Sequence, residues 1–378
     1  MSRDIALYIH VPFCRHKCPY CSFVSYDYRE ADIPLYLSAL KKELIRRAGG
    51  ECIRSIYFGG GTPSLLSVEY VGDLISVISS LFTVDEAAEI TIEANPGTIN
   101  RAYLTTIREL GVNRLSLGVQ SLNDRELALL GRIHTAAEAR DAVQNARGSG
   151  VDNLSIDLIY GLPGQTLSDW QHTLDEVITM KPEHLSLYSL TLEAETPMWR
   201  AIKEGSLPVL DPDVSADHYE LAEDLLVAQS YSHYEISNWA IAGRECRHNL
   251  TYWRNLPYLG VGVASHSCLD GHRLVNTKSL DKYLADFSGK SLPVPELDEE
   301  INPELELAET AILGLRLCEG INLDDIHRRF GMDILVHYRQ QVEEMVDAGL
   351  LEQADGNIKL TRRGRLLSNE VFWRFLPG

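Results

Sequence analysis

The sequence predicts an α/β protein with a second, smaller domain at its C-terminal end. Three observations support this prediction: short apolar segments alternate with amphipathic ones about six times, the apolar segments are rich in Ile, Leu, Val and Tyr, and the composition changes after about residue 295. Such alternation indicates parallel strands joined by helical crossovers, with strands buried on both faces. We expect a first domain over 1–295 and a second over 296–378.

Six segments are expected to form the parallel strands. They are 6–13, 55–61, 89–96, 114–121, 153–163 and 184–193. The segments between them have helical periodicity: over 32–50 apolar side chains recur every three or four residues, and Gly49 is placed to end that helix. The stretch 67–82 repeats the pattern. Asn123 is expected to cap a further helix, with Glu126 three positions later as in a capping box.

The C-terminal part is expected to form a winged-helix-like domain. The stretch 291–303 is rich in proline and acids and indicates a linker. Helical patterns follow over 306–317, 323–331 and 334–350. The stretch 350–361 then indicates a hairpin with Asp355-Gly356 in its turn.

Charge excludes one class of partner. The chain of 378 residues has 35 basic and 54 acidic side chains, a net charge of −19 that repels phosphate backbones. Nucleic acid is therefore not expected as a partner, and the basic cluster Arg362, Arg363 and Arg365 is expected to be a solvated face. No apolar run approaches the roughly 18 residues of a membrane span, and the N-terminal stretch, interrupted by Asp4 and His10, is not a signal peptide.

Polar residues and glycines follow the ends of the six expected strands. They are the cysteine loop 14–21, Gly59–Gly61, Glu93 and Asn95, Gln120 and Ser121, Asp157, and Ser189 and Thr191. Ligands collect at the carboxyl ends of parallel strands, so we expect these groups to form one site. The loop FGGGTPS lacks the Gly-Lys-Ser/Thr ending of a phosphate loop, which disfavours a nucleoside triphosphate, whereas its glycines allow backbone to approach a ligand closely.

Cys14, Cys18 and Cys21 lie in one short stretch after the first strand. The four remaining cysteines are scattered and form no secreted disulfide framework, so a reducing cytoplasm is the expected compartment. Three interpretations of the three cysteines stay open. They are buried structural thiols, a zinc site completed by His10 or His16, and an iron–sulfur cluster with one iron left open. The charged residues between the cysteines disfavour burial, and the lack of a second Cys-x-x-Cys pair disfavours zinc.

The spacing Cys-x3-Cys-x2-Cys, with Tyr20 before the last cysteine, resembles that of the radical S-adenosylmethionine (SAM) superfamily. The resemblance implies that the three cysteines hold a [4Fe-4S] cluster and that its open iron chelates the amino and carboxylate groups of SAM. It also implies that the glycine loop receives the amino group of SAM, and that Glu93 binds its hydroxyl or amino groups.

A closer resemblance covers most of the chain. The motifs YIHVPFCRHKCPYCSF, YFGGGTPS, IEANPG, RLSLGVQS and SIDLIYGLPGQT are similar to those of the oxygen-independent coproporphyrinogen III oxidase group. This implies a partial six-unit (β/α) barrel with a small appended domain. The SAM contacts that it implies by position are Tyr8, Tyr20, Gly60, Gly61, Thr62, Glu93, Gln120, Arg132, Asp157 and Thr191. Some members of the group hold two SAM molecules, so the number bound is left open.

Two features separate the chain from the oxidase itself. Phe23 stands where the oxidase has a further cysteine, and the first strand begins near residue 5 without the extension that precedes it in the oxidase. Residues 248–253, HNLTYW, match the His-Asn-x-x-Tyr-Trp motif of the heme-chaperone branch of the group. The resemblance implies a protein that binds heme and passes it to an acceptor protein not named by the sequence, with the oxidase as the alternative and enzymatic activity left open.

The segment 231–276 is rich in aromatic and histidine side chains, as a macrocycle site would require. Within it, His248 is the expected axial ligand of heme iron, and Asn249 is expected to orient the imidazole. Tyr252 and Trp253 are the expected ring contacts. No Cys-x-x-Cys-His motif is present, so the sequence does not support covalent heme attachment.

Overall fold

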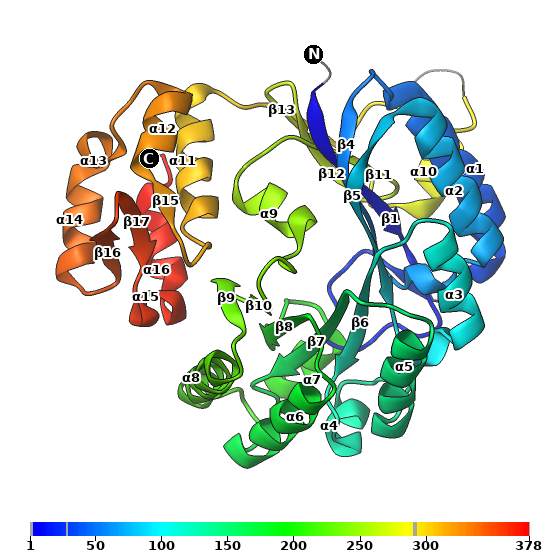
Figure 1. Cartoon of the computed structure of the whole chain (residues 1–378), viewed down its shortest axis with the longest axis horizontal. Helices are drawn as coiled ribbons and strands as arrows, with labels where there is room; N and C mark the ends of the chain where they lie inside the picture. The colour runs from blue at the N-terminus through cyan, green and yellow to red at the C-terminus, as the bar shows by residue number, and fades with distance from the viewer. Residues whose placement is uncertain (1–2, 28, 290–292, 378) are drawn as a thin grey trace.

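A twelve-stranded sheet forms the body of the protein in the computed structural model, which describes residues 3–27, 29–289 and 293–377 (Figure 1). Its central strands are parallel and follow chain order. They are β1 (Asp4–Val11), β4 (Cys52–Gly60), β5 (Thr83–Ala94), β6 (Arg114–Gln120), β7 (Leu154–Tyr160) and β8 (His184–Ser189). These are the six predicted strands, and the α/β fold class with a partial barrel is confirmed.

Helices cover the outer face of this curved sheet (Figure 1). They are α1 (Ile33–Arg47), α2 (Val68–Leu81), α3 (Arg101–Glu109), α5 (Ala136–Gly148), α6 (Leu167–Thr179) and α8 (Pro212–Ala228). Two short helices, α4 (Asp124–Leu129) and α7 (Pro197–Lys203), follow the carboxyl ends of β6 and β8, and the N–H of Met198 in α7 donates to the carbonyl of Pro19 in the cysteine loop at 3.0 Å. α1 ends at Arg47, two residues before the predicted Gly49. The Asn123 cap is confirmed, because its side chain accepts from the N–H of Arg125. The capping box is wrong, since Glu126 instead accepts a hydrogen bond from Ser121.

The aromatic and histidine-rich segment is divided between the two ends of the sheet. β9 (Ser232–Glu235) and β10 (Asn238–Ala240) extend the sheet beyond β8. β11 (Tyr258–Val261) pairs in parallel with β1 at the other end, and β12 (His266–Leu269) and β13 (His272–Val275) follow it. The helix α9 (Arg247–Trp253) lies between these two ends (Figure 1). A further helix is α10 (Leu280–Asp286).

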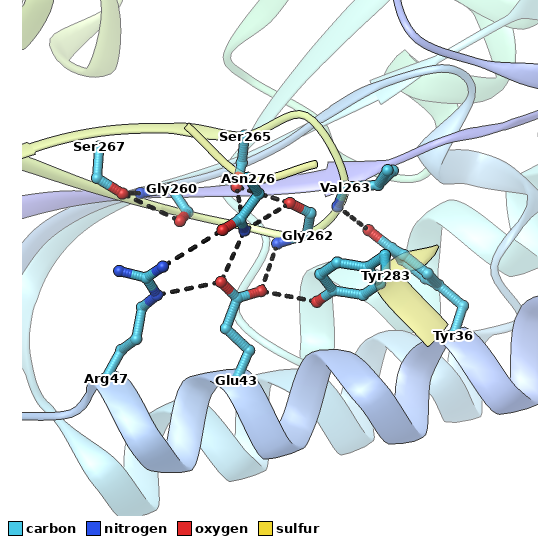
Figure 2. Close-up of polar contacts among 10 residues, drawn as sticks. All are labelled: Tyr36, Glu43, Arg47, Gly260, Gly262, Val263, Ser265, Ser267, Asn276 and Tyr283. Atoms are coloured by element: carbon cyan, nitrogen blue, oxygen red, sulfur yellow. Dashed lines mark hydrogen bonds and ion pairs between the residues drawn. The ribbon is translucent and has the colours of Figure 1, made fainter. Parts of the chain in front are cut away.

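A buried carboxylate fastens α1 to the segment after β11 (Figure 2). Glu43 is fully buried and accepts hydrogen bonds from the N–H of Gly262 (2.8 Å), from Asn276 (2.7 Å) and from Tyr283 (2.7 Å). Tyr36, also on α1, donates to the carbonyl of His10 at 2.6 Å. Because a buried charge is tolerated only when its lone pairs are satisfied, this network fixes the end of β1, which leads into the cysteine loop.

The predicted linker 291–303 is partly wrong. Leu297–Glu300 form a strand, β14, that pairs antiparallel with β13 and so belongs to the large sheet, while 290–292 lie outside the described residues. Edge pairing satisfies backbone groups that a linker would leave to solvent. The division of the chain at 295 and 296 stays a prediction.

The C-terminal part has its own hydrophobic core, drawn from residues 307–375. Its helices are α11 (Pro303–Gly314), α12 (Leu323–Phe330), α13 (Ile334–His337), α14 (Arg339–Asp347), α15 (Arg362–Leu366) and α16 (Ser368–Phe372). Its sheet has the order β15 (Ile321–Asn322), β17 (Asn357–Leu360) and β16 (Leu351–Ala354). The predicted hairpin is confirmed, and its turn residues Asp355 and Gly356 have φ of +53° and +78°, the positive values of a two-residue hairpin turn.

The expectation that the basic cluster is a solvated face is confirmed in part: Arg362 and Arg363 are exposed, whereas the side chain of Arg365 is only 14% exposed. Arg365 forms an ion pair with Glu223 of α8, and Arg362 pairs with both Glu223 (3.2 Å) and Asp224 (2.8 Å). The guanidinium groups therefore fasten α15 to α8 and join the two cores. A one-dimensional charge pattern does not reveal that acids 138 residues away face these arginines.

The shorter elements are the strands β2 (Phe13–Cys14) and β3 (Tyr26–Asp27) and the 3-10 helices η1 (Glu30–Asp32), η2 (Pro63–Leu65), η3 (Pro96–Thr98) and η4 (Trp373–Phe375). β2 and β3 pair with each other and bracket the cysteine loop. Among the residues that the structure describes, no helix combines the length and the apolar character needed to cross a membrane.

Candidate functional site

A cavity of about 340 Å³ opens at the carboxyl ends of the parallel strands. The groups predicted at the strand ends line it together: Cys14, Cys18, Cys21, Gly60, Gly61, Thr62, Glu93, Asn95, Gln120, Asp157, Ser189 and Thr191. Tyr20 and Arg132 line it as well, whereas Tyr8, Ser121 and His248 are not part of its lining. The structure thus gathers side chains from six strand ends around one space.

The cysteine loop presents three free, partly exposed thiols to this cavity. Thr62 donates a hydrogen bond to the sulfur of Cys14 at 3.6 Å, and Arg132 donates to the sulfur of Cys18 at 3.7 Å. The loop is closed by a turn in which the N–H of Cys21 donates to the carbonyl of Cys18 at 3.0 Å. Donors aimed at sulfur stabilise thiolate, the form that ligates metals.

The donor set fits an iron–sulfur cluster better than zinc. His10, one predicted fourth zinc ligand, is buried and already bonded on both ring nitrogens, to Tyr8 (3.0 Å) and to the carbonyl of Val24 (2.8 Å). Three separated thiolates match a four-iron cube, because each binds a different iron.

Two glycines bring backbone against the cavity. Gly60 has φ +117°, and a Cβ there would lie 2.6 Å from the ring of His10. A Cβ on Gly61 would lie 2.7 Å from the carbonyl oxygen of Phe13. No other residue fits this loop without displacing the wall, so the close approach of backbone that the sequence indicated is built into the structure.

Glu93 and Asp157 supply the carboxylates of the cavity. Glu93 accepts from Tyr57 (2.9 Å) and from the N–H of Gly60 (3.1 Å), and burial raises its pKa to about 7 despite these hydrogen bonds. Asp157 accepts from the hydroxyl groups of Ser116 (2.9 Å) and Ser155 (3.1 Å), and burial raises its pKa as well. Both acids can therefore accept hydrogen bonds from a ligand while their own oxygens are held in place.

The HNLTYW motif forms α9, which is fastened to the barrel by its first turn. The N–H groups of Arg247 and His248 each donate to Glu89 of β5 at 3.1 Å. A carboxylate at a helix N-terminus satisfies otherwise unpaired N–H groups and opposes the positive end of the helix dipole. At the other end of the motif, the guanidinium carbon of Arg316 lies over the indole of Trp253, 4.3 Å from the centroid of the indole ring. The motif therefore docks a helix between barrel and C-terminal domain.

The interpretation of His248 as an iron ligand conflicts with this geometry. Its side chain belongs to a residue only 1% exposed, and its ring nitrogens are bonded to Ser55 and to Tyr252, both at 2.9 Å. Burial lowers the pKa of His248 to about 3, so the ring is neutral. The ring stacks on Tyr57 at 4.9 Å, and Tyr57 in turn holds Glu93. His248 thus supports the cavity wall from behind.

Asn249 does not orient the imidazole in this structure, because both ring nitrogens have other partners; Asn249 lines the cavity. Tyr8 lies behind the wall, with its ring near Gly59 and its hydroxyl bonded to His10. Sequence reasoning missed Tyr57, Arg114 and Ser116, which line the cavity from within the strands. The period-two spacing of Arg114, Ser116 and Gln120 was the available signal for an inward-facing row.

Comparison with known proteins agrees with this geometry. The radical SAM superfamily model matches residues 8–177, and the HemN C-terminal domain model matches 301–367. Coproporphyrinogen III oxidase (HemN) from Escherichia coli has a similar structure, with a TM-score of 0.87 at 25% identity over 99% of this chain and 90% of that chain. The fold and the cysteine loop define a radical SAM protein, a class whose members hold a [4Fe-4S] cluster and SAM.

Relatives of nearly equal length narrow the assignment. Heme chaperone HemW of Bacillus subtilis is 35% identical over 98% of each chain, and that of Escherichia coli is 34% identical over 98% of each. The chain belongs to the HemW family.

The raised pKa of Glu93 predicts that SAM binding depends on pH. The ionised carboxylate is the better acceptor for the amino and hydroxyl groups of SAM, and with a pKa of about 7 it is mostly ionised at pH 8 and mostly protonated at pH 6. We expect affinity to fall roughly tenfold from pH 8 to pH 6, measured by equilibrium dialysis. Glu93→Gln should bind SAM more weakly and almost independently of pH. An equally steep pH profile in this variant would assign the titration to another group.

Proposed function

We propose that this protein binds heme and delivers it to an acceptor protein in the cytoplasm, and that it carries a [4Fe-4S] cluster and SAM in the strand-end cavity. The observation that carries the proposal is the similarity, along nearly the whole of both chains, to relatives named heme chaperones. The acceptor is not identified by any feature of the chain.

The cavity residues divide by chemistry. Cys14, Cys18 and Cys21 would hold the cluster, which when bound coordinates SAM at its open iron and supplies it with an electron. The backbone at Gly60 and Gly61 would face the amino group of SAM. The remaining proposed SAM contacts are Tyr20, Thr62, Glu93, Gln120, Arg132, Asp157 and Thr191, all of which line the cavity. Tyr8, a contact expected from the sequence, would act only indirectly, through its hydrogen bond to His10 behind the wall.

The mouth of the cavity offers a surface for heme. Phe23 and Tyr188 both line the cavity, yet they are 67% and 45% exposed. Exposed aromatic rings at a cavity mouth leave apolar surface in water. Covering them with a flat apolar ring removes that surface from water and stabilises the complex. Phe23 occupies the position at which the sequence departs from the oxidase. We therefore place heme against these two rings, with no role for His248 as ligand.

Heme titration tests this placement. We expect the protein to bind heme, and Phe23→Ala combined with Tyr188→Ala to weaken binding roughly tenfold, because about 1–2 kcal/mol of aromatic contact is lost. His248→Ala should leave the absorbance spectrum of bound heme unchanged. Trp373→Ala is the matched control, since Trp373 is an exposed aromatic residue away from the cavity. A changed spectrum in His248→Ala would restore the ligand role, and absence of heme uptake by the unmodified protein would remove the proposed function.

The structural similarity to the Escherichia coli oxidase makes oxidase activity the second candidate. We expect no conversion of coproporphyrinogen III under anaerobic conditions with cluster, SAM and reductant present. Turnover on the order of 1 per second would make the oxidase the better assignment.

A further inference from the structure

One charged side chain inside the cavity has no partner. Arg114 begins β6, is 2% exposed and lines the cavity from its floor, on the same inward-facing row as Ser116 and Gln120. A guanidinium has five N–H donors, yet no hydrogen bond or ion pair joins that of Arg114 to any residue that the structure describes, and its Nε is buried without an acceptor. A buried guanidinium without an acceptor is strongly unfavourable, so such a group points to a ligand.

The acids around Arg114 are engaged elsewhere. Glu89 receives the first N–H groups of α9, Glu93 receives Tyr57 and Gly60, and Asp157 receives two serine hydroxyls. Glu89 acts on the Arg114 guanidinium only through its charge, and none of the three acids forms an ion pair or a hydrogen bond with it. These carboxylates partly balance the positive charge of Arg114 but accept no hydrogen bond from its guanidinium.

The neutral neighbours are occupied as well. His184 is bonded to Ser155 (2.9 Å) and to Tyr234 (2.8 Å), and His248 to Ser55 and Tyr252. Burial, and then the charge of Arg114, lower the pKa of both histidines, which are therefore neutral. The polar groups around Arg114 are thus bonded to one another, while Arg114 lines the cavity with its Nε buried and unbonded.

We propose that Arg114 binds a carboxylate of the molecule that enters this cavity. The planar fork of a guanidinium matches a carboxylate in a bidentate pair. Two sources share this chemistry: the amino-acid carboxylate of an S-adenosyl compound, through the oxygen that iron would not hold, and a propionate of a tetrapyrrole. The inference rests on the proposed function in that one of these molecules must enter the cavity.

Four probes in two matched pairs identify the source. SAM is compared with decarboxylated SAM, which keeps the amino group and the sulfonium and lacks only the carboxylate, and heme with its dimethyl ester, which lacks free propionates. Binding is measured by equilibrium dialysis on the cluster-loaded protein and on Arg114→Met. We expect Arg114→Met to bind one carboxylate probe at least tenfold more weakly and to bind its carboxylate-free partner as the unmodified protein does. The pair that shows this difference names the source.

Controls separate binding from folding. Arg140→Met removes an arginine of the outer surface that pairs with Glu176, and it should change no affinity. The melting temperature of unliganded Arg114→Met should not fall below that of the unmodified protein. The carboxylate probe should raise the melting temperature of the unmodified protein but not that of Arg114→Met. Arg114→Lys keeps the positive charge but not the planar guanidinium, and it replaces the Met variant in the experiment if that variant does not fold. It should likewise bind the carboxylate probe more weakly and the carboxylate-free probe unchanged.

Two outcomes overturn the inference. Equal affinities of Arg114→Met and the unmodified protein for all four probes would show that Arg114 touches no ligand. An equal loss for the probes with and without carboxylate would show that it only balances the acids of the cavity. If the unmodified protein binds none of the probes, the proposed function fails instead, and the inference fails with it.

Discussion

Replacing Cys14, Cys18 or Cys21 by alanine should lower the iron content of the anaerobically reconstituted protein from about four per chain to below one. A methyl group cannot replace a thiolate, and two remaining ligands hold a cube too weakly to survive gel filtration. The broad visible absorbance should disappear together with the iron. Iron and labile sulfide analysis, with an absorbance spectrum, measures the effect.

The chain supplies a matched control for these variants. Cys268 is partly exposed like the three loop cysteines but does not line the cavity. Cys268→Ala should therefore retain the full iron content. Undiminished iron in a variant with all three loop cysteines replaced, or one zinc per chain in the unmodified protein, would contradict the cluster assignment.

Substituting Gly60 by alanine should reduce SAM affinity more than a hundredfold. The backbone at Gly60 has φ +117°, which an L-residue adopts only with strain, and the new Cβ would lie 2.6 Å from the His10 ring. Both nitrogens of that ring are hydrogen-bonded, so the ring cannot move away without losing a hydrogen bond. The loop must shift instead, and it takes with it the N–H that Gly60 donates to Glu93. Loss of more than about 2.7 kcal/mol corresponds to the expected change in affinity.

Gly164→Ala isolates the contribution of the cavity. Gly164 also has a positive φ, +74°, but a Cβ there meets open space and lies away from the cavity. Both variants should keep their iron, because the cysteines are unchanged. SAM affinity that is equally affected in the two variants would mean that general backbone strain, and not the wall of the cavity, sets binding.

The docking of α9 explains how distant segments shape one site. Glu89 holds the first turn of the helix, and His248 transmits that position through the stacked ring of Tyr57 to Glu93. The carboxylate in turn holds the Gly60 loop. A chain of contacts therefore runs from the HNLTYW motif to the proposed SAM pocket, which gives the motif a function in positioning that requires no contact with iron.

Sequence pattern was sufficient to predict the six parallel strands, their order and the place of the site. These strands are largely buried and most of the helices between them are buried on one side, so hydrophobic periodicity located them. Parallel strands in a crossover fold present their carboxyl ends on one side, and for this reason the sequence places the cysteine loop, Gly60, Glu93 and Asp157 at one site.

The partners of the inward-facing and interdomain residues become evident only in the folded protein. Arg362 and Arg365 resemble solvated charges until α8 places Glu223 opposite them. His248 resembles an iron ligand until Ser55 and Tyr252 are seen to occupy its nitrogens. The partner of a polar side chain is set by residues far away in the chain, and local pattern carries no information about that distance. Arg114 is the opposite case, because the folded cavity shows that its Nε has no hydrogen-bonding partner among the described residues.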